Sequence, residues 1–310
     1  MSLTVLFAAG AEDWPDYRPA LQSALADAGL HADLVLEADP AQVDYIIYAP
    51  SSAVQDFRPF TRCKAVLSLW AGVERIVGNA TLTQPLCRMV DPALTQGMID
   101  YVCGHVLRYH LGMDAHIAAR AGAWHPTPPP LAQERRVGIL GLGALGAACG
   151  QALAGLGFAV HGWSRRKRQI AGLLCHHGQQ GLRECLSQAE ILVTLLPLTD
   201  NTENLIDADA LALLPAGARL INPGRGGLID DTALLAALDQ GHLAHATLDV
   251  FRTEPLPVRH PFWAHPGVTV TPHIAAATRP DTAAQVIAEN ITRAEAGQPL
   301  LHRVDRTQGY

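Results

Sequence analysis

Three side chains that could together move a proton lie in three short segments of the second half of the chain. Arg225 belongs to the segment NPGRGG, Glu254 to LDVFRTEP and His273 to TPHIAA. A guanidinium can hold a carboxylate through two hydrogen bonds, and an imidazole can donate a proton near neutral pH. A carboxylate beside that imidazole can fix its orientation and favour its protonated form. The set therefore suits protonation of an oxygen on a small anionic molecule.

Each of these segments follows a stretch that is predicted to be a strand, at residues 219–222, 246–250 and 268–271. In open α/β sheets the ligand crevice lies at the carboxyl ends of the strands, so the three side chains can converge there. Taken singly, each residue also has an ordinary explanation. Arg225 could form a salt bridge in a turn, Glu254 could lie in a surface loop, and His273 is one of 14 histidines.

A glycine-rich loop, GLGALG at residues 141–146, lies between a predicted strand at 137–140 and a predicted helix at 144–156. The first glycine permits the tight turn, the second lets a pyrophosphate approach the backbone, and the third lets the helix pack on the strand. We expect a dinucleotide whose pyrophosphate lies at the helix N-terminus. The alternatives are a purely structural turn or another nucleotide-like ligand. The expected contacts are Gly141, Gly143, Ala144, Leu145 and Gly146.

The segment WSRRKR, which follows the next predicted strand at 158–163, indicates which dinucleotide is bound. A site for NAD usually has an acidic residue here, which holds the ribose hydroxyls. This chain instead offers a hydroxyl and several cations that could bind a 2′-phosphate, chiefly Ser164, Arg165 and Arg166. NADP(H) is therefore the preferred cofactor, with NAD(H) possible. The alternative is a solvated basic loop.

Short apolar runs alternate with helical stretches, a pattern typical of parallel sheets with helices on both faces. Before the glycine-rich loop, strands are predicted at residues 3–9, 33–36, 45–49, 65–70 and 87–90, and helices at 17–28 and 95–121. A further strand is predicted at residues 191–196 and a last helix at 281–296. Since 310 residues exceed one typical core, we expect an α/β protein with two doubly wound parallel sheets.

Charge and composition exclude several classes of partner. The net charge of −6 argues against a general binder of nucleic acids or anionic membranes, although a few arginines can still attract a small anion. No segment approaches the roughly 18 apolar residues that a membrane helix needs. The six cysteines and 14 histidines show no zinc-type spacing, so we expect no metal site. Reduced, buried thiols favour a cytoplasmic location.

The motifs GxGxxG, NPGRG, LDVFxxEP and TPHIA occur together in one order, and on them the chain resembles the D-2-hydroxyacid dehydrogenase family over nearly its whole length. It is most similar to the glyoxylate/hydroxypyruvate reductase A branch, on the evidence of WSR at 163–165 and LWAGVE at 69–74, together with Thr278, Arg279 and Pro280. The resemblance implies two Rossmann-like domains and a homodimer. A cofactor domain at 94–280 would be inserted into a flavodoxin-like substrate domain made of 1–93 and 281–310.

The resemblance also implies a reaction, the NADPH-dependent reduction of glyoxylate to glycolate and of hydroxypyruvate to D-glycerate. Arg225 would bind the substrate carboxylate and polarise the ketone, while His273 would protonate the developing alkoxide as hydride arrives. Glu254 would orient the imidazole. Further substrate contacts are expected at Trp70, Ala71, Gly72 and Arg279, and further cofactor contacts at Leu196, Pro197, Pro223 and Asp249.

Two other hypotheses are compatible with the sequence. Trp70 stands where the family has a smaller or leucine-type residue, so the substrate could be a bulkier aryl or branched 2-oxo acid. Trp70 could equally be a core residue. A non-catalytic protein that senses a nucleotide would use the same fold, but the intact set of Arg225, Glu254 and His273 argues against it.

Overall fold

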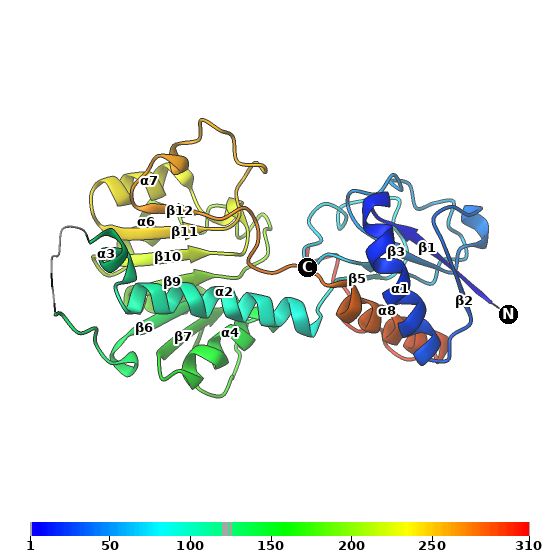
Figure 1. The fold of residues 1–310 in the computed structure, drawn as a ribbon, viewed down its shortest axis with the longest axis horizontal. Coiled ribbons are helices and arrows are strands. Elements are labelled where there is room, and N and C mark those ends of the chain that lie inside the picture. The colour runs from blue at the N-terminus through cyan, green and yellow to red at the C-terminus, as the bar shows by residue number, and fades with distance from the viewer. Residues whose placement is uncertain (1, 120–123, 125, 310) are drawn as a thin grey trace. The chain divides into compact units, whose positions relative to one another are not determined.

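The polypeptide folds around two parallel β-sheets (Figure 1). Each sheet has buried apolar clusters of its own. The computed structural model describes residues 2–119, 124 and 126–309. Unit 1 is formed by Met1–Leu94 and Ala277–Tyr310, and unit 2 by Thr95–Ala276. The first division, after Leu94, lies one residue from the boundary expected after residue 93. The second, after Ala276, lies four residues from the boundary expected after residue 280.

Unit 1 contains a five-stranded sheet in the order β2-β1-β3-β4-β5. Its elements are β1 (Leu3–Ala8), α1 (Trp14–Asp27), β2 (Ala32–Val35), β3 (Tyr45–Tyr48), β4 (Ala65–Ser68), β5 (Leu86–Cys87) and α8 (Pro280–Glu295).

Alternation along β1 separates the two faces of this sheet. Val5 and Phe7 pack with the buried sides of α1 and α8, whereas Leu6 and Ala8 belong to a second cluster on the opposite face. That second face is covered by loop residues such as Phe57, because residues 49–64 and 69–85 form no α-helix. In unit 1 the α-helices therefore cover one face of the sheet, and loop side chains, among them aromatic rings, cover the other.

Unit 2 contains a seven-stranded parallel sheet in the order β12-β11-β10-β9-β6-β7-β8. Its helices are α2 (Pro92–His110, which begins in unit 1), α3 (Met113–Ala118), α4 (Ala144–Gly155), α5 (Gly178–Gln188), α6 (Ala208–Leu213) and α7 (Asp231–Asp239). Its strands are β6 (Arg136–Leu140), β7 (Ala159–Ser164), β8 (Leu173–His177), β9 (Ile191–Thr194), β10 (Ala218–Asn222), β11 (Leu243–Leu248) and β12 (Val268–Val270).

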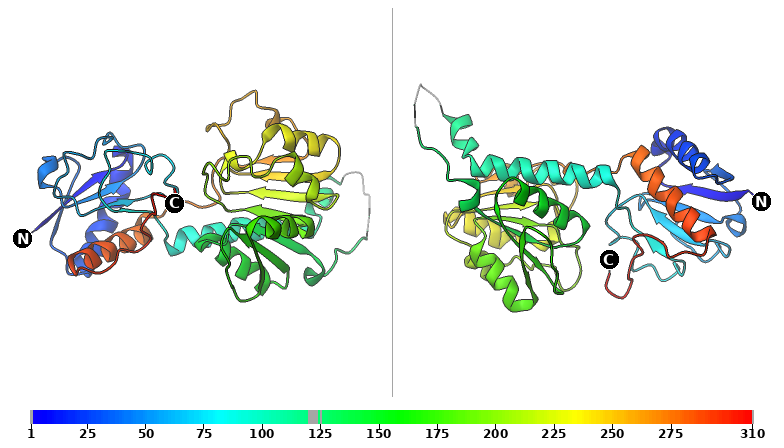
Figure 2. Two further views of the ribbon diagram at one scale, coloured as in Figure 1. Left: turned by 180° about the vertical axis from the view of Figure 1, so that it is seen from behind. Right: turned by 90° about the horizontal axis from the view of Figure 1, so that it is seen from below.

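Helices cover both faces of the sheet of unit 2 (Figures 1 and 2). Ile139 points to the face on which α2 and α4 pack, and the next residue, Leu140, points to the face covered by α5, α6 and α7. This period of two residues follows from the pleat of a strand. Both sides of each central strand are consequently buried, as the continuous apolar runs predicted.

Two elements differ from the sequence-based expectation. The helix expected at 95–121 ends at His110, because Gly112 adopts a left-handed conformation (φ +63°) before α3 begins. Residues 120 and 121 of that expectation lie outside the described residues. Strand β8 was not predicted, since it ends in two histidines and lies at the edge of the sheet, where a continuous apolar run is not required.

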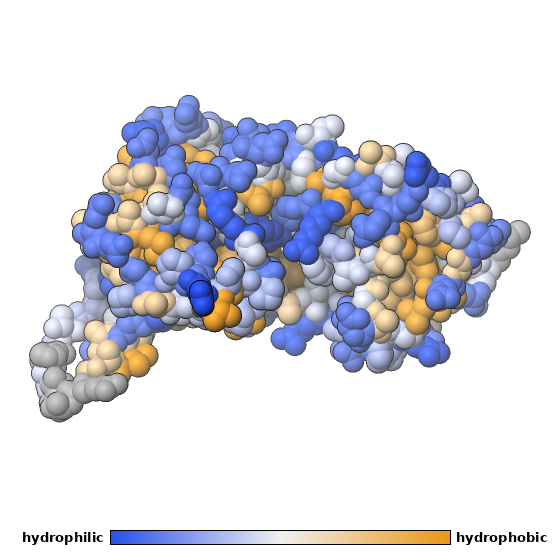
Figure 3. All heavy atoms as spheres, turned by 90° about the horizontal axis from the view of Figure 1, so that it is seen from above, coloured by the Kyte–Doolittle hydropathy of each residue, from blue (hydrophilic) through white to orange (hydrophobic). Residues whose placement is uncertain are grey.

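Apolar side chains are exposed on and around α3. They are Leu111, Met113, Ile117, Trp124 and Leu131. Figure 3 shows apolar surface at this end of unit 2. In the part of the chain that the structure describes, no helix is long and apolar enough to cross a membrane.

Candidate active site

His273 and Glu254 meet beyond the carboxyl ends of β12 and β11, which are neighbours in the sheet. Nδ1 of His273 lies 2.8 Å from Oε2 of Glu254, and the other carboxylate oxygen accepts the backbone N–H of Phe251 at 2.9 Å. A carboxylate can only accept, so Nδ1 carries the hydrogen and Nε2 is left for another partner. The histidine side chain is 52% exposed, which leaves its ring accessible.

The backbone of His273 is strained, because its φ of +54° lies in the left-handed region. Such a conformation costs a non-glycine residue about 1–3 kcal/mol and persists only where the surroundings enforce it. The N–H of His273 donates to the carbonyl of Asp249 at 2.9 Å and lies 3.1 Å from that of Thr271. The direction of the imidazole is thus set by backbone contacts as well as by Glu254.

Asp249 is fully buried, and both of its carboxylate oxygens accept hydrogen bonds from the segment that carries His273. Oδ1 accepts the Thr271 hydroxyl at 2.6 Å and the N–H of Ile274 at 2.9 Å, while Oδ2 accepts the N–H of Ala275 at 2.9 Å. The sequence suggested a cofactor contact for Asp249, and that contact stays a prediction. The role of Thr271 was missed, because only the fold places its hydroxyl on a buried carboxylate.

Arg225 lies in a loop that packs directly against the Glu254 loop. Buried Asn222, the last residue of β10, donates from its amide to the carbonyl of Arg225 at 2.9 Å. A Cβ on Gly226 would lie 2.0 Å from the carbonyl carbon of Phe251, so only glycine permits this approach. The two loops therefore lie in direct contact, and Arg225 precedes the glycine at which they meet.

The glycine-rich loop connects the carboxyl end of β6 to α4. It therefore lies at the same end of the parallel strands as His273. A Cβ on Gly146 would lie 1.8 Å from the carbonyl oxygen of Gly141, and one on Gly141 would lie 2.5 Å from that of Leu195. Gly143, by contrast, has open space where its Cβ would be, at the N-cap of α4. The first-turn N–H groups of a helix have no partner within it, so this space suits a pyrophosphate.

The basic loop begins where β7 ends, beside β6 in the sheet. The Ser164 hydroxyl donates to the carbonyl of Arg166 at 2.8 Å, and the side chains of Arg165 and Arg166 are exposed. No acidic residue occurs between 163 and 168. The residues present therefore fit a dinucleotide that carries a 2′-phosphate.

The remaining cofactor contacts that were predicted also lie at this edge, because all strands of the sheet are parallel. Leu196 and Pro197 follow β9 and are partly buried, whereas Pro223 follows β10 and is buried. The glycine-rich loop, the basic loop and the pair formed by His273 and Glu254 thus all belong to unit 2. They follow the carboxyl ends of strands of one parallel sheet, namely β6, β7, β9, β10, β11 and β12.

The predicted substrate contacts other than Arg225 and His273 belong to unit 1. Trp70, Ala71 and Gly72 follow β4, and Arg279 is the N-cap residue of α8. Trp70 is 42% exposed, with the guanidinium of Arg75 5.9 Å from its ring centre, so it is not a core residue. Its backbone is held by the Ser68 hydroxyl, which accepts the Trp70 N–H at 3.0 Å.

Among residues 2–119, 124 and 126–309, no group of three histidine, cysteine, aspartate or glutamate side chains could hold a metal ion. All six cysteines are unpaired, and burial raises the pKa of Cys149 and of Cys185 to about 12. These thiols therefore stay protonated and are poor nucleophiles.

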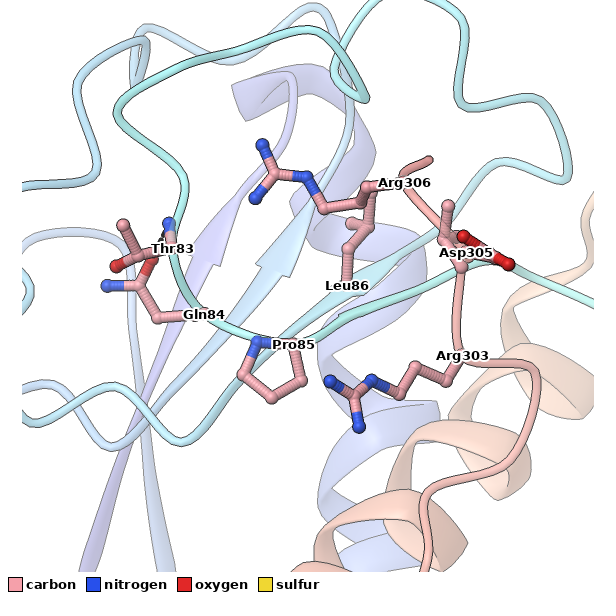
Figure 4. Close-up of a pocket in the computed structure, with 8 residues that line it drawn as sticks. Thr83, Gln84, Pro85, Leu86, Arg303, Asp305 and Arg306 are labelled. Atoms are coloured by element: carbon pink, nitrogen blue, oxygen red, sulfur yellow. Dashed lines mark hydrogen bonds between the residues drawn. The ribbon is translucent and has the colours of Figure 1, made fainter. Parts of the chain in front are cut away.

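A hollow of about 400 Å³ in unit 1 contains none of the predicted site residues (Figure 4). It is lined by Thr83–Leu86 and Arg303–Arg306. The guanidinium of Arg306 donates to the carbonyls of Val77, Asn79 and Leu82. This arginine therefore connects the C-terminal segment to the loop at residues 77–82, which indicates a structural role.

Comparisons with known proteins indicate the family. Residues 105–275 match the family model described as the NAD binding domain of D-isomer specific 2-hydroxyacid dehydrogenases. A glyoxylate/hydroxypyruvate reductase A from Salmonella heidelberg (strain SL476) is 38% identical over 300 residues, covering 94% of this chain and 95% of its own. The protein of the same name from Serratia proteamaculans (strain 568) is 42% identical over 257 residues, covering 80% and 82%.

Solved structures give the same result. A D-isomer specific 2-hydroxyacid dehydrogenase from Xanthobacter autotrophicus Py2, in complex with NADPH and MES, superimposes with a TM-score of 0.93 at 42% identity and covers 100% of both chains. An NADPH-dependent glyoxylate/hydroxypyruvate reductase from Sinorhizobium meliloti, in complex with NADP and sulfate, gives a TM-score of 0.87 at 34% identity over 100% of both chains.

The glycine-rich loop generates a prediction about stability in the absence of ligand. Gly146→Ala forces a methyl group against the backbone of Gly141 and should destabilise unit 2 by about 1–3 kcal/mol, the usual cost of overpacking. Gly143→Ala places its methyl group in open space and should leave stability nearly unchanged. Thermal unfolding followed by circular dichroism compares the two. Equal melting temperatures for both variants would contradict this description of the loop.

Proposed function

Since the chain belongs to the D-isomer specific 2-hydroxyacid dehydrogenase family, we propose that it reduces glyoxylate to glycolate and hydroxypyruvate to D-glycerate with NADPH. The observation that carries the proposal is the 2.8 Å contact between His273 and Glu254, at the sheet edge that also bears the glycine-rich loop. The relatives named for these substrates, which cover most of this chain, support the choice of small 2-oxo acids.

When bound, NADPH supplies the hydride for the ketone carbon of the substrate. Arg225 pairs with the substrate carboxylate and polarises the carbonyl, because a guanidinium stabilises negative charge on both groups. His273 donates the proton on Nε2 to the alkoxide oxygen. Glu254 keeps the imidazole oriented by accepting the hydrogen on Nδ1.

The N-terminus of α4 would hold the pyrophosphate through the backbone of Gly141, Gly143, Ala144, Leu145 and Gly146. The basic loop would hold the 2′-phosphate through Ser164, Arg165 and Arg166. The rest of the cofactor would contact Leu196, Pro197, Pro223 and Asp249, which all lie at the carboxyl edge of the sheet. The Xanthobacter protein, whose structure contains NADPH, supports this assignment.

Residues of unit 1 would also contact the substrate. The backbone N–H groups around Ala71 and Gly72 would bind the substrate carboxylate, and Arg279 would add a second cation. Trp70, which is 42% exposed, would wall the pocket. With these contacts, unit 1 would be the substrate domain and unit 2 the cofactor domain.

The protein would act as a homodimer in the cytoplasm. The exposed apolar side chains on and around α3 are the kind of surface that a second copy covers. The six unpaired cysteines suit a reducing compartment.

The direct test is oxidation of NADPH and of NADH in the presence of glyoxylate, hydroxypyruvate, pyruvate and phenylpyruvate, followed by the loss of reduced-nicotinamide absorbance. Turnover of the two small acids, with NADPH preferred, is the expected result. Turnover of phenylpyruvate alone would contradict the substrate assignment and direct attention to Trp70. Binding of NADPH without turnover of any of the four acids would contradict the proposed function.

Cofactor preference can be tested separately in the basic loop. The double variant R165A/R166A should raise KM for NADPH by about 100-fold or more, because two charge-assisted hydrogen bonds contribute about 1.5–3 kcal/mol each. Its KM for NADH should stay within about 2-fold of the wild-type value, since NADH has no 2′-phosphate.

The matched control is K167A/R168A, which removes the same charge from exposed positions of the same loop. Its effect on KM for NADPH should not exceed about 3-fold, the scale of exposed charge interactions. An equal penalty for NADPH and NADH in R165A/R166A would refute the assignment of these arginines to the 2′-phosphate.

A further inference from the structure

Three consecutive backbone N–H groups around the histidine all bind to Asp249. The N–H of His273 donates to its carbonyl at 2.9 Å, and those of Ile274 and Ala275 donate to its carboxylate, also at 2.9 Å. Because Asp249 has no solvent exposure, water does not compete for these bonds. The left-handed backbone of His273 therefore depends on the exact placement of one buried side chain.

The Asp249 carboxylate is in turn fixed by Thr271, whose hydroxyl lies 2.6 Å from Oδ1. A carboxylate accepts, so the threonine proton is committed to this bond. The hydroxyl of Tyr101 lies 2.7 Å from the same threonine oxygen and must then be the donor. Burial raises the pKa of Tyr101, which keeps that proton in place. The chain of donors runs from Tyr101 through Thr271 to Asp249.

Tyr101 is itself held by α2. A Cβ on Gly97, one turn earlier in that helix, would lie 3.6 Å from the carbonyl oxygen of Ala275 and from Cα of Ala276. The helix thus packs against the segment that follows His273 at the same place where Tyr101 reaches Thr271. The Tyr101 ring also lies against the ring of His105, with centres 4.5 Å apart. The start of the donor chain is consequently anchored in a long helix.

We propose that Thr271 and Tyr101 are positioning residues for the reaction, which hold Asp249 and through it the left-handed backbone that aims His273 at the substrate. The inference rests on the proposed function, because the aim of His273 matters only if His273 donates a proton. Neither hydroxyl touches the imidazole, so both act through Asp249. A small displacement of the imidazole should slow proton transfer far more than it weakens substrate binding.

Thr271→Val keeps the shape of the side chain and removes its hydroxyl, and Thr271→Ser keeps the hydroxyl and removes a methyl group. The valine variant should lower kcat at least about 10-fold, with KM for glyoxylate within about 2-fold of wild type. The serine variant should recover most of kcat. If Thr271 had only a structural role, the valine variant would be less stable but would not show a fall in kcat with KM unchanged.

Tyr101→Phe has a matched control in Tyr109→Phe, two turns further along α2. Tyr109 is more deeply buried than Tyr101, and its hydroxyl lies 2.6 Å from Oγ1 of Thr247 and 2.8 Å from Nδ1 of His245, with no bond to Asp249. Both variants lose a hydrogen bond between a tyrosine and a threonine hydroxyl, and Tyr109→Phe, which also loses the contact with His245, should lose at least as much stability as Tyr101→Phe. Only Tyr101→Phe should lower kcat, by about 3- to 10-fold.

One experiment combines these variants with the wild type, measuring turnover of glyoxylate with NADPH and the ¹H–¹⁵N spectrum of histidine-labelled protein. Wild-type kcat in Thr271→Val, or an equal fall in Tyr101→Phe and Tyr109→Phe, would overturn the inference. An inactive wild type would instead refute the proposed function. The positioning role would then be decided by the His273 signals, which should shift in Thr271→Val and Tyr101→Phe but not in Tyr109→Phe.

Discussion

The contact between Glu254 and His273 is the interaction on which the rest of the site depends. It joins two loops that leave neighbouring parallel strands, so it exists only if β11 and β12 pair in the register observed, with Leu248 opposite Val270. A slip of one residue would send every side chain of a strand to the other face. The alternating cores on the two faces of unit 2 protect against such a slip, and the fold in this way sets the distance between a proton donor and its orienting carboxylate.

Different loops at the carboxyl ends of the strands suit cofactor binding and the reaction itself. The glycine-rich loop and the basic loop offer backbone N–H groups and cations to an anionic dinucleotide, whereas Arg225 and His273 suit the carboxylate and the ketone of a small substrate. The net charge of −6 does not oppose this, because the cations that matter are local. Gly226 is important beyond its own loop, since its missing side chain lets the Arg225 loop lie against the Glu254 loop.

Much of this arrangement could be predicted from the sequence, because the glycine-rich loop, Arg225, Glu254 and His273 each lie in a short motif directly after a strand. The network behind His273 could not. Tyr101 and Thr271 are 170 residues apart, and only tertiary packing reveals that their hydroxyls meet over a buried carboxylate. Composition did not reveal that the left-handed backbone of Gly112 ends a helix that was predicted to be longer. Nor did it reveal that the buried ring of Phe57, rather than a helix, packs on one face of the sheet of unit 1.

The most direct measurement is kcat/KM for glyoxylate reduction at neutral pH by wild-type protein and by Glu254→Gln. Reduction needs an imidazole that aims Nε2 at the developing alkoxide, and the Glu254 carboxylate sets this direction by accepting the hydrogen on Nδ1. The account predicts that kcat/KM falls about 10-fold or more in Glu254→Gln, because an amide can also present an N–H group to Nδ1 and no longer fixes the ring. The control Glu203→Gln removes an exposed carboxylate that pairs with Arg252 and should leave kcat/KM unchanged. Equal kcat/KM for wild type and Glu254→Gln would contradict the central claim.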